Sequence, residues 1–85
     1  MAKSDDFSFE VVKDLGEFGD GSWPKHLAKV KWNGGATKLD IRPWNEDMTK
    51  MGRGISLTYN EAFNLYDLLG HYFNSEEGKN DMPKE

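Results

Sequence analysis

Residues 38–57 read KLDIRPWNEDMTKMGRGISL, and this stretch decides the fold because it holds two strand patterns joined by a polar loop. Successive side chains of a strand point to opposite faces, so Leu39 and Ile41 are predicted to share one face. The opposite face takes Lys38, Asp40, Arg42 and Trp44. The charged residues predict that this face is exposed. A face that is only solvated rarely carries a large aromatic, so Trp44 predicts that a ligand covers this exposed surface.

Strand patterns continue on the N-terminal side of this stretch. Alternating apolar and polar residues predict four strands, at residues 7–15, 25–32, 36–44 and 50–57. Asn33, Gly34 and Gly35 predict a tight hairpin, since Asn and Gly adopt positive φ at little cost. Gly52 and Gly54 predict either a β-bulge or the close approach of a backbone or ligand.

One helix is predicted over residues 59–74. Thr58 and Glu61 precede and open it at the spacing of a capping box, in which each side chain satisfies an amide at the helix start. Its apolar residues cover far more than the arc of about 100° that packs on one sheet, so we expect a second partner, another copy in a C2 dimer. The residues assigned to this dimer interface are Leu65, Leu68, Leu69, Tyr72 and Phe73.

Length and composition indicate one small domain. The 85 residues are 36% hydrophobic, and we predict disordered polar ends at 1–6 and 75–85 around a single ββββα domain at 7–74. A core of this size is marginal and has no cysteine to form a disulfide, which also favours an oligomer. The lack of cysteine, of a long apolar segment and of a signal-peptide core predicts a cytoplasmic protein with no membrane partner.

Charge is distributed unevenly along the chain. The net charge is −4, but residues 23–53 carry seven cations against three acids, or +4, while residues 1–22 and 54–85 each carry two against six, or −4. Local potential steers a polyanion more than total charge does, so the middle of the chain remains compatible with nucleic acid.

Catalytic and metal-binding constellations are not found in the sequence. His26 and His71 are far apart and match no zinc spacing, so each is predicted to have a surface or capping role. Ser56 lacks a neighbouring base, and the GRG run lacks the remainder of a phosphate loop. We therefore predict a protein that is not an enzyme and needs no cofactor, metal or small-molecule substrate.

Cations interleaved with aromatics recur on successive strand patterns. Such surfaces bind single-stranded nucleic acid, because cations neutralise phosphates and flat side chains stack on any base. The residues predicted to contact phosphates are Lys25, Lys29, Lys31, Lys38, Lys50 and Arg53. Those predicted to stack are Trp32 and Trp44, with Arg42 stacking or bridging phosphates and Phe18 and Trp23 as further contributors.

Two of these aromatics have a competing interpretation. Trp32 shares the strand parity of Ala28 and Val30, so core packing is as compatible with the pattern as ligand contact. Trp23 precedes Pro24 in a loop, and the pattern does not separate the two cases for it.

The run Lys38-Leu39-Asp40-Ile41-Arg42, a nearby tryptophan, and then Gly52-Arg53-Gly54-Ile55-Ser56-Leu57 before a helix resembles the transcriptional coactivator positive cofactor four family. The bacterial members of the YdbC type are the most similar, over about residues 29–69. The resemblance implies an α+β fold, a four-stranded antiparallel β-sheet followed by one C-terminal α-helix, in a homodimer that binds single-stranded DNA. The positions that it matches are Trp32, Lys38, Arg42, Trp44 and Arg53.

Residues and resemblance together lead to one expectation with two alternatives. We expect a sequence-independent single-stranded DNA-binding homodimer that acts in transcription regulation, replication or repair and is associated with the nucleoid in the cytoplasm. The alternatives are a single-stranded RNA binder and a protein-interaction module that uses exposed aromatics. Coactivation of the eukaryotic kind is not expected, because the serine-rich N-terminal region of those members is missing.

Overall fold

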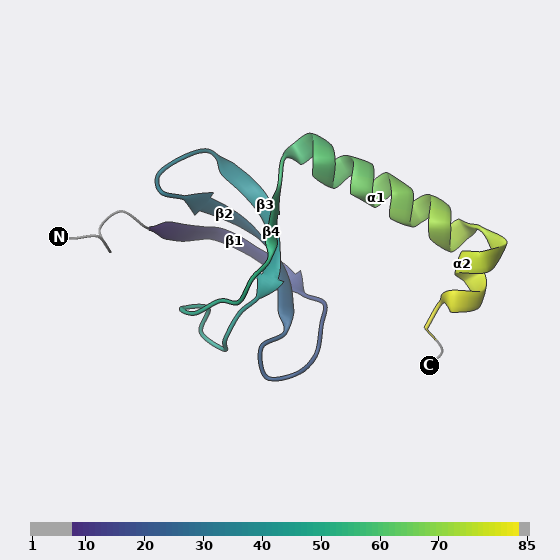
Figure 1. Cartoon of the computed structure of the whole chain (residues 1–85), viewed down its shortest axis with the longest axis horizontal. Coiled ribbons are helices and arrows are strands. Elements are labelled where there is room, and N and C mark those ends of the chain that lie inside the picture. The colour runs from purple at the N-terminus through teal and green to yellow at the C-terminus, as the bar shows by residue number, and fades with distance from the viewer. Residues whose placement is uncertain (1–7, 84–85) are drawn as a thin grey trace.

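The computed structural model describes residues 8–83 as four strands followed by two helices (Figure 1). They are β1 (Phe9–Glu17), β2 (Lys25–Trp32), β3 (Thr37–Pro43), β4 (Ile55–Leu57), α1 (Tyr59–Asn74) and α2 (Glu76–Asp81). The strands pair in chain order, each antiparallel to the next, so the sheet is an open meander with β1 and β4 at its edges. The α+β class and the four-stranded antiparallel sheet are confirmed.

The hydrophobic core lies on one face of the sheet, which we call the core face. Ala28 and Val30 of β2 are fully buried there against Trp44, which follows β3. The partly buried residues packed around these three are Phe9, Val11, Trp32, Met48 and Met51. Met48 and Met51 belong to the connection between β3 and β4, so a loop rather than a helix closes the core.

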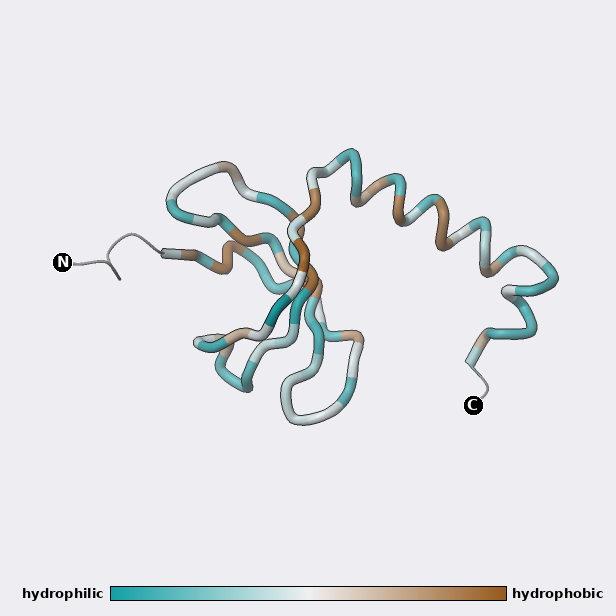
Figure 2. The backbone as a smooth tube through the Cα atoms, in the orientation of Figure 1, coloured by the Kyte–Doolittle hydropathy of each residue, from teal (hydrophilic) through white to brown (hydrophobic). Residues whose placement is uncertain are grey.

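The opposite face, which we call the open face, carries aliphatic residues beside the lysines of β2, and no other part of the described chain covers it in this way. The pairs Leu27–Ile41 and Leu39–Leu57 lie side by side across the strands. Helix α1 contacts β3 and β4 where it begins and then extends away from the sheet (Figure 1). Hydrophobic residues recur along α1 (Figure 2), yet none of its residues is buried. The open face and the first turns of α1 therefore line an apolar groove of about 710 Å³.

The start of α1 confirms the predicted capping box. Glu61 N donates to Thr58 Oγ1 at 3.0 Å, and Thr58 N donates to Glu61 Oε1 at 2.9 Å. The helix spans the predicted residues, Tyr59–Asn74. Of the helices that the structure describes, none has the length and apolar character that crossing a bilayer requires.

Strand bounds follow the predictions for β2 and the hairpin but not for β4. Asn33 and Gly34 have φ of 51° and 73°, as the tight turn requires. Only Ile55–Leu57 forms β4, so the prediction of a strand from residue 50 is wrong. The reason is local: Asn45 Oδ1 accepts hydrogen bonds from Thr49 N and Lys50 N, both at 2.9 Å, which folds the segment into a turn.

The predicted disorder of residues 75–85 is wrong where α2 forms. Gly78 N donates to Ser75 Oγ at 3.0 Å, which caps this second helix. Gly78 is buried against the carbonyl of Tyr72, where any Cβ would overlap backbone atoms, so a glycine is what lets α2 fold back on α1. The described residues therefore form two C-terminal helices rather than one. The disorder expected at residues 1–6 lies outside the described residues.

Candidate nucleic-acid interface

A hydrogen-bonded chain of side chains crosses the core face, and we call Trp32, Asp40, Arg42 and Ser56 the Asp40 network. Asp40 is fully buried, and Arg42 donates to both of its carboxylate oxygens, from Nε at 2.6 Å and from Nη2 at 2.8 Å. Ser56 Oγ donates to Asp40 Oδ2 at 2.7 Å and accepts from Trp32 Nε1 at 3.0 Å. Every strand from β2 to β4 thus contributes to one fixed arrangement.

Arg42 and Trp32 form the accessible end of this network. The guanidinium carbon of Arg42 lies 4.7 Å from the centre of a Trp32 ring, and both residues are partly exposed. A cation over an indole face contributes about 0.5 to 2 kcal/mol, depending on its desolvation. An open hollow of about 360 Å³ adjoins the pair, lined also by Asn33, Met51 and Ser56. Flat side chains beside a hollow are suited to receive a planar ring.

The prediction that Trp44 is exposed is wrong. Its side chain is fully buried beneath the loop at 45–51, with its ring centre 5.5 Å from that of Phe9. The alternation along the strand correctly predicted that Trp44 shares a face with Arg42. In the structure, however, that face is the core face. Trp44 therefore belongs to the core and cannot stack on a base in this structure. Its indole Nε1 has no hydrogen-bond partner among the described residues.

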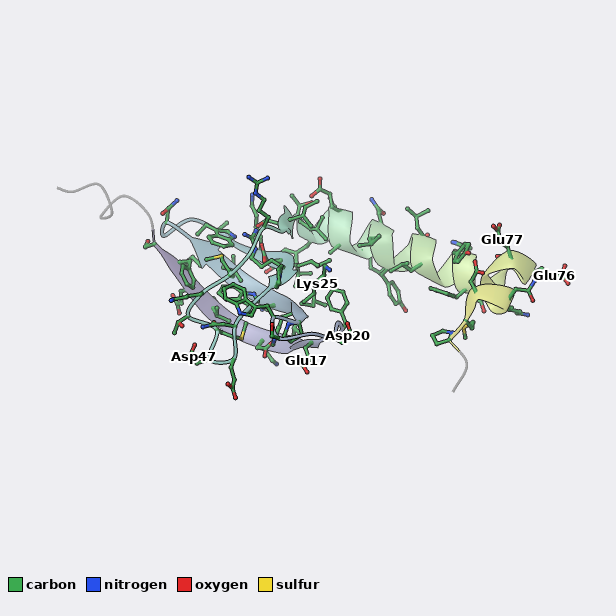
Figure 3. The ribbon with its side chains drawn as sticks, turned by 60° about the horizontal axis from the view of Figure 1, so that its bottom comes forward. Glu17, Asp20, Lys25, Asp47, Glu76 and Glu77 are labelled. Atoms are coloured by element: carbon green, nitrogen blue, oxygen red, sulfur yellow. The ribbon has the colours of Figure 1, made fainter. Side chains whose placement is uncertain are left out.

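The loop over Trp44 is held by its own side chains. Thr49 Oγ1 donates to Asp47 Oδ1 at 2.6 Å, and this hydrogen bond is the main reason why the pKa of Asp47 lies below its ordinary value. Met48 adopts a positive φ of 59° within the same turn. Asp47 lies at the tip of this loop, away from the helices (Figure 3).

The predicted phosphate-contacting lysines do not share one face. By register, Lys38 shares the core face with Arg42, while Lys25, Lys29 and Lys31 lie on the open face. The sequence pattern placed cations on successive strands but did not fix which face each strand would show. The structure thus places Lys38 on the same face as Trp32 and Arg42 and the β2 lysines on the other face.

The β1–β2 loop carries two further predicted residues and one acid, Asp20, and Glu17 directly precedes it. Phe18 and Trp23 are 59% and 42% exposed, so both are available for contact. Phe18 N donates to the carbonyl of Lys25 at 2.8 Å, which brings this end of β2 next to Glu17. Figure 3 shows Glu17, Asp20 and Lys25 at the same end of the sheet. The acids offset the charge of Lys25, so this end attracts phosphate less than the hairpin end does.

The Gly52-Arg53-Gly54 segment passes tightly over the end of β3. Gly52 N donates to the carbonyl of Pro43 at 2.9 Å, and a Cβ on Gly54 would overlap Arg42 Cβ and the Ile41 carbonyl. The close approach predicted at Gly52 and Gly54 is therefore made by the backbone of the same chain, at the end of β3. Arg53 and Lys50 remain exposed on this segment.

Of the two histidines, His26 is buried and His71 is exposed. His26 Nδ1 lies 3.0 Å from Asp14 Oδ1, and its Nε2 lies 3.6 Å from Glu17 Oε1. Both acids reach it because β1 carries two register shifts, between Val11 and Lys13 and between Asp14 and Gly16. The prediction of a surface or capping role is wrong for His26, which is a satisfied structural residue.

Asp40 and Ser56 were missed as site residues by sequence reasoning. The signal available for Asp40 was its spacing from Arg42, because residues two apart on one strand share a face. The sequence does not specify the register between β3 and β4, so it does not predict that Asp40 pairs with Ser56.

Fold and site together define a small α+β protein with an open four-stranded sheet and a cation–aromatic surface. No family model matches the chain. It is 44% identical over 69 residues to an uncharacterized protein of Treponema pallidum (strain Nichols), a match that covers 78% of this chain and 80% of that protein. The chain therefore belongs to the same family as the Treponema protein.

Proposed function

We propose that this protein binds single-stranded DNA without sequence preference, as a homodimer. The observation that carries the proposal is the Arg42 guanidinium held over Trp32 beside an open hollow. A base of any identity offers a flat face to such a pair, and stacking contributes about 1 to 3 kcal/mol per base. Recognition of this kind does not depend on base edges, so it carries little sequence information.

Phosphate contacts would come from the exposed cations near this pair. Lys38 lies on the core face, and Lys50 and Arg53 lie on the exposed segment between β3 and β4. Lys29 and Lys31 lie on the open face at the hairpin half of β2, where single-stranded DNA that passes around the hairpin end of the sheet would meet them. Each neutralised phosphate releases counterions, so binding should weaken with salt.

The homodimer is supported by the uncovered apolar surface. The open face and α1 of one chain meet at an angle (Figure 1), so each chain offers both a groove and an apolar helix. A second copy related by a twofold axis would place its helix in this groove and receive the first helix in return. All five residues assigned to the dimer interface are exposed in the single chain: Leu65, Leu68, Leu69, Tyr72 and Phe73.

A titration of labelled oligo-dT, followed by fluorescence anisotropy, tests the DNA-binding proposal. We expect binding at low salt, a linear fall of log K with log salt, and weak binding to a blunt duplex of the same length. Trp32→Ala should weaken binding by about 5-fold to 150-fold. The absence of binding to oligo-dT at low salt would refute the proposal. A parallel titration with oligo-U distinguishes DNA from RNA.

The groove also favours a second candidate, a protein-interaction module. An apolar groove with few polar atoms fits an amphipathic helix from another protein as well as one from a second copy. A protein that sediments as a monomer and does not bind oligo-dT would favour this candidate. A dimer that binds oligo-dT would favour the first, with a role in transcription, replication or repair.

A further inference from the structure

We propose that Asp40 and Ser56 are positioning residues that hold Arg42 over Trp32, so that this pair stacks on one base while Arg42 makes no phosphate contact. The inference rests on the proposed single-stranded DNA binding and specifies how its central pair acts. Arg42 thereby differs from the cations Lys38, Lys50 and Arg53.

Three of the five N–H groups of the Arg42 guanidinium already donate within the protein. Its Nε and Nη2 donate to the two oxygens of Asp40, and its Nη1 points to the sulfur of Met51 at 3.7 Å. This Nε–Nη2 edge is one of the two edges of a guanidinium that can hold a phosphate in a two-point contact. A phosphate there would have to displace a fully buried carboxylate and leave it without its counter-charge, which is strongly unfavourable.

The planar faces of Arg42 remain for stacking. The guanidinium carbon lies over the Trp32 ring, and the adjoining hollow is bordered by Arg42 and Trp32 together. Because Asp40 neutralises the guanidinium, binding a base there releases few counterions. The pair should therefore contribute affinity that does not depend on salt.

Ser56 connects the two halves of this platform. Its hydroxyl donates to Asp40 and accepts from the Trp32 indole, so the orientation of the indole depends on the same carboxylate that orients the guanidinium. A surface whose rotamers are fixed before binding loses less side-chain entropy when a ligand arrives. By fixing the rotamers of Arg42 and Trp32, Asp40 and Ser56 would reduce the entropy that these side chains lose on binding.

The test is a charge-neutral double variant, Asp40→Asn with Arg42→Gln, which leaves no buried charge unpaired. Binding to oligo-dT is measured by anisotropy across a salt series, at a temperature where thermal melts show each variant folded. We expect affinity to fall by about 5-fold to 150-fold at every salt concentration. The slope of log K against log salt should equal that of the wild type.

Lys38→Gln calibrates the slope, because losing one phosphate contact should reduce its magnitude by about 0.7. If the double variant shows the same reduction, Arg42 is a phosphate contact and the inference is wrong. Unchanged affinity in the double variant would also overturn it. A wild-type protein that does not bind oligo-dT refutes the proposed function, and this inference with it, so the two failures are distinguishable.

Ser56→Ala provides a second test that keeps the Asp40–Arg42 pair intact. We expect weaker binding with an unchanged salt slope and a shifted Trp32 emission in the free protein, because the indole loses its hydrogen-bond acceptor. Ser56→Thr, which retains the hydroxyl, should bind more tightly than Ser56→Ala. If Ser56→Ala lowers only the melting temperature and binds like the wild type, Ser56 is merely structural and the positioning role is refuted.

Discussion

At the scale of single residues, burial rather than residue type separates the core aromatics from those that we propose for binding. Trp32 and Trp44 follow equivalent patterns of cations in the sequence, yet only Trp44 is fully buried. The difference arises because the loop at 45–51 folds back over the core face and places Met48 and Met51 in that core. An aromatic next to a cation on a strand therefore does not by itself mark a binding surface.

Trp44 should determine stability rather than binding. Trp44→Ala removes the largest buried side chain and should cost about 3 to 5 kcal/mol in the free energy of unfolding, measured with urea. Trp44→Phe should cost less, because it keeps a ring in the core and removes an indole N–H that has no partner among the described residues. A small loss for Trp44→Ala would contradict its place in the core.

Gly54 should tolerate no side chain. A Cβ there would overlap Arg42 Cβ and the Ile41 carbonyl, so Gly54→Ala should destabilise the fold by about 1 to 3 kcal/mol. Gly70→Ala is the matched control, since a Cβ at Gly70 meets no atom within 4 Å, and alanine should stabilise α1 by about 1 kcal/mol. Urea unfolding of both variants compares them; equal effects would contradict the close approach.

At the scale of elements, the sequence predicts local signals well and long-range ones poorly. The hairpin at Asn33 and the capping box at Thr58 are confirmed because each depends on residues within a few positions. The position of Trp44 depends on how the loop at 45–51 folds against the strands. The short β4 is an exception, because the local hydrogen bonds of Asn45 with Thr49 and Lys50 replace the strand there. Helix α2 was missed because its stability comes from Gly78 packing on the end of α1, which composition does not show.

The contact between α1 and α2 should depend on pH. Tyr72 donates a hydrogen bond to Asp81, and this bond is the main cause of the raised pKa of Tyr72. A raised pKa in the folded state stabilises the protonated form, so the contribution is complete below the ordinary tyrosine pKa and is lost as pH rises through the raised value.

Asp81→Asn should therefore lower the pKa of Tyr72 toward its ordinary value, as measured by tyrosinate absorbance. Tyr59→Phe and Tyr66→Phe simplify the titration to one tyrosine. If the remaining tyrosine titrates identically with and without Asp81→Asn, α2 does not hold this contact in solution.

At the scale of the whole molecule, the two faces of the sheet differ in burial. The core face holds the buried residues and the Asp40 network, while the open face and α1 remain apolar and uncovered. The wide apolar arc of the helix predicted a second partner from sequence alone, and the single chain leaves that surface without one. The distribution of the lysines over both faces could not be predicted, because it depends on the register of β2.

Dimerisation should depend on the apolar side of α1. Leu69 lines the groove and is 48% exposed, so Leu69→Glu should shift the protein to a monomer in sedimentation velocity. Asn64→Glu adds the same charge to α1 at an exposed position outside the groove and should leave the dimer intact. Equal sedimentation of wild type and Leu69→Glu would contradict self-association through this groove.

The two register shifts in β1 have a consequence for assembly beyond His26. They leave Val12 and Leu15 as extra residues that interrupt the ladder, on the strand that forms one free edge of the sheet. An interrupted edge is a poor template for another strand, so chains cannot add to one another indefinitely through their backbones. Fibril growth is thus disfavoured at this edge, which favours the proposed association through the open face, where a closed pair would bury the apolar surface of both members.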